Sequence, residues 1–384
     1  MLPSRSQIAV VGAGLAGSSV AAALAQRDHD VVLLERDEFP RDKVCGEFLS
    51  PETVESLQTL GCCERFFEFE PPAINGARIA TPDGSRLELA LNSTAYGMSR
   101  RRLDELLFDH ARDCGAAAFD GADVRRIDAD AGGPTRLHVD TGTDGQTETL
   151  DAGLVVAAYD RRTRLDRQLQ RPFFEQRSTQ VGMKRHHRIT ADACDSLPPL
   201  DDVVELHIFD GGYCGISFVE DDIVNVCTMF DRRLLQRDGF RGSRFWEYFR
   251  TRDTPLGERL RSLEPCDTDT CAVAQIPLQL KERAGDNGVL YVGDAAGMIA
   301  PLAGDGQAMA IESGLQLAQL IDASMPENPQ RQWNRRWRRR YEVRLRLGRV
   351  LQGAMTRPRL ASAAISALDA VPAVGRKLVE WTRG

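Results

Sequence analysis

Residues 8–17 read Ile-Ala-Val-Val-Gly-Ala-Gly-Leu-Ala-Gly, an apolar run that leads into three glycines at Gly-x-Gly-x-x-Gly spacing. Ile8–Val11 predicts a short buried parallel strand, and the alanine-rich stretch Gly14–Gln26 predicts a helix. Asp30–Leu34 is a second apolar run, which completes a β-α-β unit. Such a unit typically opens a parallel sheet that binds a dinucleotide.

Each glycine of this motif has its own expected role. Gly12 allows the tight turn, Gly14 lets the backbone approach a pyrophosphate, and Gly17 lets strand and helix pack closely. Glu35 ends the second strand, where a carboxylate binds ribose hydroxyls and repels a 2′-phosphate. We therefore predict a dinucleotide site, with Arg36 next to Glu35 among its contacts.

A second glycine-rich motif lies late in the chain. An apolar strand ends in Gly-Asp at Asp294, and Pro301, Gly304 and Gly306 follow in a loop before a helix. Ligands bind at the carboxyl ends of strands in open α/β sheets, and glycines let the main chain lie close to a flat ligand. An ordinary glycine-rich loop explains the motif equally well when it is taken alone.

The composition restricts the class of protein. The chain has 384 residues, is 42% hydrophobic and carries a net charge of −7, which excludes a disordered chain and argues against nucleic-acid binding. Its nine cysteines show neither CxxC nor zinc spacing, so we expect reduced thiols, no metal site and a cytoplasmic protein. Ile8–Ala25 resembles a leader peptide in apolarity, but its glycine motif argues against that interpretation.

The middle of the chain changes character. Three strand-like runs, Val203–Phe209, Cys214–Val219 and Ile223–Phe230, are separated by short polar turns. This pattern predicts an antiparallel meander, unlike the β-α-β unit of the first section.

The order of the motifs resembles a known family. The N-terminal glycine motif, Arg100 before a helix, and the late Gly-Asp with Pro-x-x-Gly-x-Gly resemble the FAD-binding pattern of the para-hydroxybenzoate hydroxylase superfamily. Lys43–Glu47 and Gly293–Gly306 are most similar to its geranylgeranyl reductase branch, and the resemblance covers most of Ile8–Leu320.

The resemblance implies roles for individual residues. The first glycine motif and Glu35 would hold the ADP half of FAD, and Arg100 would contact the dinucleotide. Asp294 would bind the ribityl chain, and Gly304 and Gly306 would lie beside the isoalloxazine ring. NAD(P)H is the implied electron donor. One departure bears on that donor, because the family's usual Asp-Gly pair is replaced here by Tyr159-Asp160.

These observations predict an α/β fold. A Rossmann-like FAD-binding domain, formed by residues 1–165 and 281–325, would enclose an inserted antiparallel β-sheet substrate domain over 166–280. Helices would occupy 326–384.

Two residues are candidates for catalysis. Cys45 follows Arg41 and Lys43, whose charges favour a thiolate, and the reductase branch places a cysteine near the flavin. It could donate a proton or position the substrate, or be a small buried thiol in a turn. Tyr213 follows a Gly-Gly turn and either points its hydroxyl into a pocket or packs in the sheet. Tyr213–Ser217 lacks the Trp-x-Trp-x-Ile-Pro segment of flavin halogenases, which disfavours halogenation.

The segment 331–349 contains nine arginines and a single acid, Glu342. Its large apolar side chains recur every four residues: Trp333, Trp337, Tyr341 and Leu345. We predict a helix that packs this face on the core. The alternative is an interfacial helix that contacts anionic lipid at a membrane surface.

Together these features predict an FAD-dependent oxidoreductase that acts on a hydrophobic small molecule. We expect a monooxygenase that hydroxylates an aromatic or polyketide-like substrate with NAD(P)H and O2. The alternatives are a flavin-dependent C=C reductase of the geranylgeranyl reductase type and a flavin-binding protein without turnover.

Overall fold

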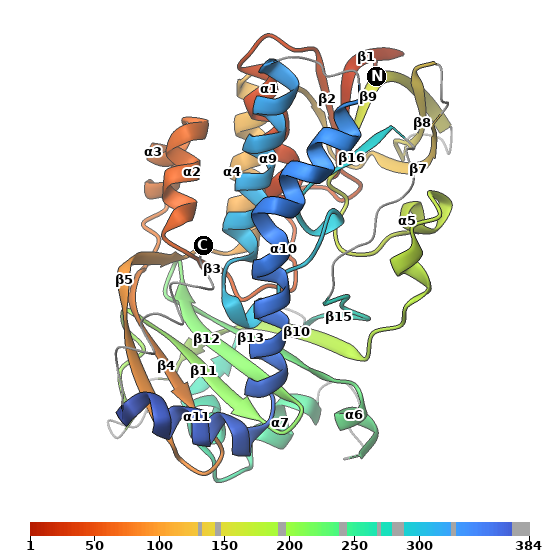
Figure 1. Ribbon diagram of the computed structural model, residues 1–384. Coiled ribbons are helices and arrows are strands. Elements are labelled where there is room, and N and C mark those ends of the chain that lie inside the picture. The colour runs from red at the N-terminus through yellow and green to blue at the C-terminus, as the bar shows by residue number, and fades with distance from the viewer. Residues whose placement is uncertain are drawn as a thin grey trace.

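The computed structural model describes residues 1–129, 133–142, 147–190, 197–237, 244–266, 270–278, 288–323 and 328–370. Two sheets lie one above the other in Figure 1, and the long helix α10 (Pro329–Met355) runs past both of them. The predicted domain limits at 280/281 and 325/326 fall outside the described residues.

The first sheet has the strand order β6-β2-β1-β9-β8-β7, and β16 also pairs with β9. Its strands are β1 (Arg5–Val11), β2 (Val31–Leu34), β6 (Ala117–Phe119), β7 (Asp123–Asp128), β8 (Thr135–Asp140), β9 (Thr147–Ala157) and β16 (Val289–Tyr291). β1 pairs in parallel with β2 and β9, as the β-α-β pattern predicts.

Both faces of this sheet are buried, which explains why its central strands are continuously apolar. Ile8 and Val10 belong to one hydrophobic core, whereas Ala9 and Val11 belong to the core on the opposite face. The first core is formed with helices α1 (Leu15–Ala25), α4 (Arg100–Asp113) and α9 (Gly306–Ala323), which lie side by side (Figure 1).

The second sheet has the order β14-β10-β13-β12-β11-β4-β5-β3, and β15 pairs with β10. Its strands are β3 (Phe48–Leu49), β4 (Ala73–Ala80), β5 (Arg86–Gly97), β10 (Gln180–Ile189), β11 (Val203–Phe209), β12 (Gly212–Val219), β13 (Ile223–Asp231), β14 (Leu263–Pro265) and β15 (Cys271–Ala274). The predicted meander is therefore present as β11, β12 and β13.

Two features of this sheet differ from the prediction. Residues 73–97, which we expected in the FAD-binding domain, form β4 and β5 in the second sheet. The reason is that β4 pairs with β11 from the predicted insert, and it does so in parallel, so the sheet is not purely antiparallel. Every other strand pair of this sheet within the described residues is antiparallel.

The C-terminal helices link the two sheets. The predicted apolar face of α10 packs inward, since Trp333, Trp337, Tyr341 and Leu345 are all buried. Trp333 Nε1 also donates a hydrogen bond to the Tyr291 carbonyl oxygen at 2.7 Å, which fixes α10 to the end of β16. Helix α11 (Pro358–Ala370) then lies against the second sheet near β5 and β11 (Figure 1).

The remaining helices are short: α2 (Glu52–Leu60), α3 (Cys63–Phe67), α5 (Arg164–Gln168), α6 (Arg233–Arg237), α7 (Arg244–Arg250) and α8 (Pro255–Arg261). Three turns are 3₁₀-helical: η1 (Pro172–Glu175), η2 (Gly293–Ala295) and η3 (Pro301–Ala303). Among the helices described, none combines the length and the apolarity that crossing a bilayer requires.

Candidate functional site

The first glycine turn has no room for side chains. Gly12 has φ +99°, and a Cβ atom on it would lie 2.5 Å from the Ala158 carbonyl oxygen. A Cβ atom on Gly17 would collide with the carbonyl oxygen of Gly12. Glycine is therefore required at both positions, and β1, β9 and the start of α1 meet at this turn.

The space in front of Gly14 is lined by cations. A Cβ atom there would lie 3.7 Å from both Arg100 Nη2 and Lys43 Nζ, and 4.0 Å from Arg41 Nη2. The N-terminus of α1 begins at this point and adds unpaired N–H groups. A helix N-terminus surrounded by three cations has the chemistry of a pyrophosphate site.

Buried carboxylates hold these cations in place. Asp104 is wholly buried and binds Arg100 Nε at 2.7 Å and Arg41 Nη1 at 2.6 Å. Burial would raise the pKa of Asp104, but Arg100 and Arg41 outweigh it and lower that pKa. Burial also lowers the pKa of Lys43, which lies 3.8 Å from Asp160.

Glu35 lies at the end of β2, as predicted. Its Oε2 accepts hydrogen bonds from the Ala13 amide at 2.8 Å and from Arg41 Nη2 at 3.1 Å, and its side chain is almost completely buried. Arg36, in contrast, is an exposed side chain paired with Asp37. Neither Glu35 nor Arg36 lines the cavity described below.

The second glycine turn packs directly against the first. Gly293 has φ +55°, and a Cβ atom on it would lie 2.7 Å from the Cβ atom of Ala16 in α1. Asp294 follows in η2, at the carboxyl end of β16. Arg171 supports this turn, because its buried guanidinium donates to the Ala295 carbonyl oxygen at 2.7 Å.

The loop between η3 and α9 is closely packed as well. Gly304 has φ +69°, and a Cβ atom on it would lie 3.2 Å from the Phe48 ring. Asp305, between the two glycines, forms a buried ion pair with Arg344 of α10. The C-terminal helix therefore fixes the loop that we expect beside the isoalloxazine ring.

One cavity connects the two turns. It has a volume of about 350 Å³ and is lined by many of the predicted site residues: Gly14, Cys45, Arg100, Tyr213, Asp294, Pro301, Gly304 and Gly306. Two lining residues that the sequence did not single out, Arg161 and Gln307, each keep a buried polar atom, Nε and Oε1, without a hydrogen-bond partner among the described residues. Arg161 Nε lies 3.4 Å from Asp160 Oδ1 as an ion pair. Narrow glycine turns, an anion cradle and unused polar atoms fit an extended FAD molecule.

The Cys45–Glu47 loop is held by the second sheet. Glu47 has φ +54° and is wholly buried, and its carboxylate binds Lys184 Nζ at 2.6 Å and His186 Nε2 at 2.7 Å. The Arg100 amide donates to the same carboxylate at 2.8 Å. Burial would raise the pKa of Glu47, but Lys184 and His186 lower it, so the group is held as a carboxylate.

Both side-chain partners of Glu47 come from the second sheet, because β10 brings Lys184 and His186 to the loop. The sequence contained one indication of this contact. Lys184 lies inside a strand-like run, and lysine is seldom buried without an acidic partner.

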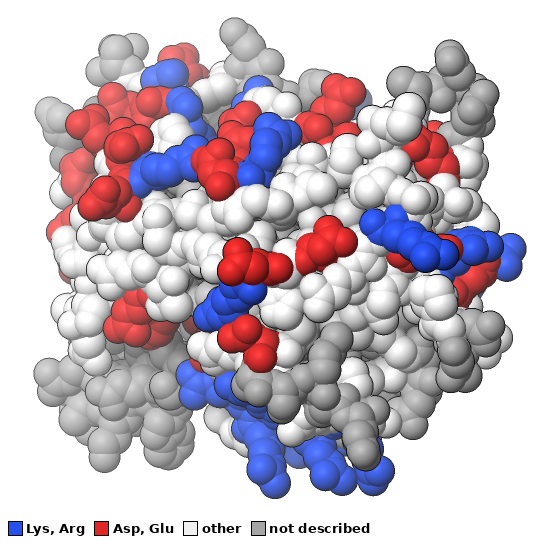
Figure 2. Space-filling model, turned by 90° about the horizontal axis from the view of Figure 1, so that it is seen from above, with Lys and Arg blue, Asp and Glu red and all other residues white. Residues whose placement is uncertain are grey.

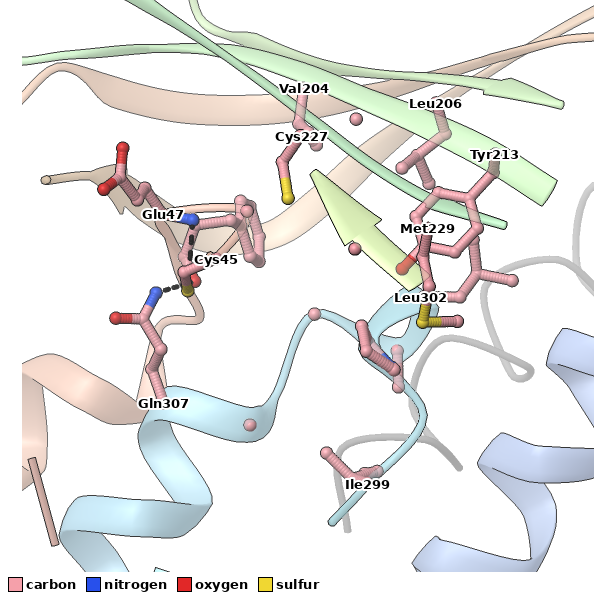
Figure 3. Close-up of a pocket in the computed structure, with 18 of the residues that line it drawn as sticks. Cys45, Glu47, Val204, Leu206, Tyr213, Cys227, Met229, Ile299, Leu302 and Gln307 are labelled. Atoms are coloured by element: carbon pink, nitrogen blue, oxygen red, sulfur yellow. Dashed lines mark hydrogen bonds between the residues drawn. The ribbon is translucent and has the colours of Figure 1, made fainter. Parts of the chain in front are cut away.

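Both catalytic candidates face the cavity. Cys45 Sγ accepts a hydrogen bond from the Glu47 amide at 3.4 Å, and the Cys45 carbonyl oxygen accepts one from Asn225 Nδ2 at 3.1 Å. Figure 3 shows Cys45 and Tyr213 on the cavity wall, with the Cys227 thiol also directed toward the space. Burial raises the pKa of Tyr213 well above its usual value, so the phenol stays protonated.

The remaining wall is aliphatic. It is formed by side chains of the second sheet and the C-terminal helices, among them Ile79, Leu87, Leu89, Leu206, Met355 and Ile365. Such a lining favours a hydrophobic ligand, since few polar groups are present to hold a hydrophilic one.

The turn that departs from the family pattern contains a non-glycine residue with positive φ. Asp160 has φ +83°, a left-handed conformation that glycine adopts easily and aspartate tolerates. Burial would raise the pKa of Asp160, but Arg161 and Lys43 lower it, so the group is charged beside the cation cradle. The Tyr159-Asp160 replacement therefore moves the carboxylate from the first to the second position of the pair, where the residue adopts a left-handed conformation that glycine also tolerates.

Comparison with known families agrees with this site. The FAD binding domain model named FAD_binding_3 matches residues 5–332, so the chain belongs to this para-hydroxybenzoate hydroxylase-type FAD family. This membership confirms the predictions of fold class and of FAD as the cofactor.

The chain is similar to two kinds of curated protein. It is 29% identical to a menaquinone reductase of Mycobacterium tuberculosis over 341 residues, covering 82% of this chain and 76% of that protein. It is 34% identical to the flavin-dependent halogenase rdc2 of Metacordyceps chlamydosporia over 127 residues, 33% of this chain and 24% of that protein. The match to a Mycolicibacterium smegmatis menaquinone reductase likewise spans only 37% of that protein.

Solved structures share the fold. The myxobacterial chondrochloren halogenase CndH superposes with a TM-score of 0.78 at 20% identity, over 97% of this chain and 91% of that chain. A geranylgeranyl bacteriochlorophyll reductase-like protein of Thermoplasma acidophilum gives a TM-score of 0.76 at 18% identity, over 94% and 91%.

Proposed function

We propose that this enzyme reduces a carbon–carbon double bond in a long apolar substrate, with NAD(P)H as electron donor. The observation that carries the proposal is the position of Cys45. Its thiol lies on the wall of a cavity that joins the glycine turns to an otherwise aliphatic space. The similarity to menaquinone reductase over 82% of the chain supports the same chemistry.

FAD, when bound, supplies hydride chemistry at its ring. The chain's own residues would orient the substrate and deliver the proton. The Glu47 amide fixes Cys45 Sγ, and the aliphatic wall excludes water from the reacting carbons. Addition of one hydride and one proton would saturate the double bond. The proton would leave Cys45 Sγ, and the resulting thiolate would then take up a proton from solvent.

The electron donor is inferred from the turn at Asp160. This residue has φ +83°, a conformation that the glycine usual in the family could also adopt. We therefore propose that NAD(P)H approaches FAD beside this turn and reduces it.

Monooxygenation is the second candidate, and Tyr213 favours it. Its buried hydroxyl stays protonated and lines the cavity, where it could donate a hydrogen bond to a phenolic substrate. An aromatic or polyketide-like molecule with an alkyl tail would fit the same aliphatic space. This reaction would transfer one oxygen atom of O2 to the substrate and reduce the other to water with electrons from NAD(P)H.

One experiment separates the two reactions. The FAD-loaded enzyme is reduced with NADPH or NADH under argon and mixed with detergent-dispersed menaquinone, and the products are analysed by mass spectrometry. We expect a product with two added hydrogen atoms that persists in air, because air would return a mere quinol to the quinone. A parallel reaction with an alkylphenol under isotopically labelled oxygen tests the second candidate, and labelled product there, with unchanged menaquinone, would refute the first.

A further inference from the structure

Helix α10 carries aliphatic side chains on its outward face. Val343 is 64% exposed, Leu347 41% and Val350 72%, and Leu360 on α11 is 49% exposed. The first three are spaced four and three residues apart, which places them on one side of the helix. Trp337 belongs to the separate apolar face of α10 that is buried in the protein, so the exposed side chains form a second apolar stripe on this helix.

Arginines flank the exposed stripe. Glu342 binds Arg338 and Arg346, and Glu312 binds Arg340. Across the part of the chain that is described, no carboxylate lies within ion-pair distance of the exposed Arg335, Arg339 or Arg349. This is a local excess of positive charge on a chain whose net charge is −7.

The position of this charge is visible from above. Figure 2, which views the molecule from above, shows blue side chains gathered at its lower edge. That edge is the side that faces the viewer in Figure 1, where α10 is drawn in front. Single exposed aliphatic residues need no explanation, but a stripe bordered by uncompensated arginines has the composition of an interfacial helix.

The same helices reach the cavity. Leu351 and Met355 near the end of α10 and Ile365 in α11 line its aliphatic wall. Val350 of the exposed stripe and Leu351 of the cavity wall are consecutive residues of α10. A long apolar molecule released at this surface would therefore meet the cavity wall directly.

We propose that the α10–α11 surface, formed by Val343, Leu347, Val350, Leu360, Arg339 and Arg349, docks on a bilayer of anionic phospholipid. The aliphatic stripe would enter the headgroup boundary, and the arginines would bind lipid phosphates. The inference rests on the proposed function in one respect, since a substrate with a long apolar chain resides in the membrane.

The test uses the FAD-loaded full chain and vesicle flotation. Vesicles of phosphatidylcholine with phosphatidylglycerol are compared with vesicles of phosphatidylcholine alone. We expect at least about tenfold more protein bound to the anionic vesicles, with binding reduced by high salt. The double variant R339E/R349E should lose this preference, and V343S/V350S should bind about tenfold more weakly while retaining the salt dependence.

A matched control and two further readouts keep the outcomes distinct. R112E changes an exposed arginine on α4 and should bind like the unaltered protein. Unchanged thermal stability of each variant excludes unfolding. Equal binding to both vesicle types, or a dimer in light scattering that V343S/V350S converts to a monomer, would overturn the docking proposal.

Turnover of detergent-dispersed menaquinone separates this proposal from the proposed function. Turnover without vesicle binding would refute the docking surface alone. Vesicle binding without turnover of any substrate would leave the surface supported and count against the proposed function alone.

Discussion

Lys184 Nζ lies 2.6 Å from a carboxylate oxygen of Glu47, and both side chains are buried. This ion pair connects β10 of the second sheet with the loop that carries Cys45. The same lysine also binds Asp42 at 3.1 Å. Burial alone would lower the pKa of Lys184, but the charges of Glu47 and Asp42 outweigh this effect and raise it. The contact positions the candidate proton donor relative to the substrate sheet.

Removing Lys184 should therefore destabilise the protein and misplace Cys45. We expect K184M to lower the free energy of unfolding by about 3 kcal/mol, because a buried carboxylate loses its main partner. Urea denaturation measures this loss. The double variant K184M/E47Q should recover part of it.

A surface ion pair provides the matched control for this prediction. Arg136 pairs with Asp151 at an exposed site, so R136M should cost less than about 1 kcal/mol. Equal effects of K184M and R136M would show that the Glu47 pair does not hold the loop.

Replacing Cys45 should separate substrate reduction from cofactor reduction. We expect C45A to retain FAD and its reduction by NAD(P)H, and to reduce the alkene about 100-fold more slowly, because the proton donor is lost. Stopped-flow absorbance follows the first step, and product analysis follows the second.

Cys227 is the control for this change, since its thiol lines the same cavity. Burial raises the pKa of Cys227, so it stays a thiol, and no step is assigned to it. C227A should keep most of the alkene reduction. Comparable rates for C45A and the unaltered enzyme would remove Cys45 from the mechanism.

His187 predicts how stability depends on pH. Burial lowers the pKa of His187 from 6.5 to about 4, with its Nδ1 at 3.1 Å from the Arg185 carbonyl oxygen. The imidazole of His187 takes up a proton near pH 6.5 in the unfolded chain and only near pH 4 in the native chain. The free energy of unfolding therefore falls as the pH drops from 6.5 towards 4. The contribution is about 2 kcal/mol between pH 7.5 and pH 5.

H187Q should reduce this dependence. Thermal or urea unfolding at the two pH values measures it, and the variant should lose less stability on acidification than the unaltered protein. An identical pH slope in the two proteins would mean that the pKa of His187 is the same in the native and the unfolded chain.

Features of the fold and of the site could be predicted from the sequence where they depend on neighbouring residues, and not where they depend on residues far apart in the chain. The tight turns at Gly12 and Gly304 could be predicted because each requirement is local and is written in consecutive residues, whereas their contacts with FAD stay a prediction. The place of β4 in the second sheet was missed, since its partner β11 lies more than 100 residues further along the chain.

The contacts of Glu47 show the same limit. Lys184 lies 137 residues away in the chain, and no local pattern indicates which buried lysine meets which carboxylate. The inward packing of Trp333 and Trp337 was predicted from periodicity, whereas the second exposed stripe at Val343 and Val350 was not, because arginines dominate that face.

Two glycine turns that are distant in the chain are expected to bind one FAD molecule together. The flavin absorbance of the purified chain, expressed as FAD per protein, measures this binding. We expect one FAD per chain, and loss of FAD in both G12A, whose Cβ would lie 2.5 Å from the Ala158 carbonyl oxygen, and D294A. The control G353A, which adds a Cβ with no neighbour within 4 Å, should retain FAD. Full flavin content in both G12A and D294A would show that the two turns do not bind FAD together.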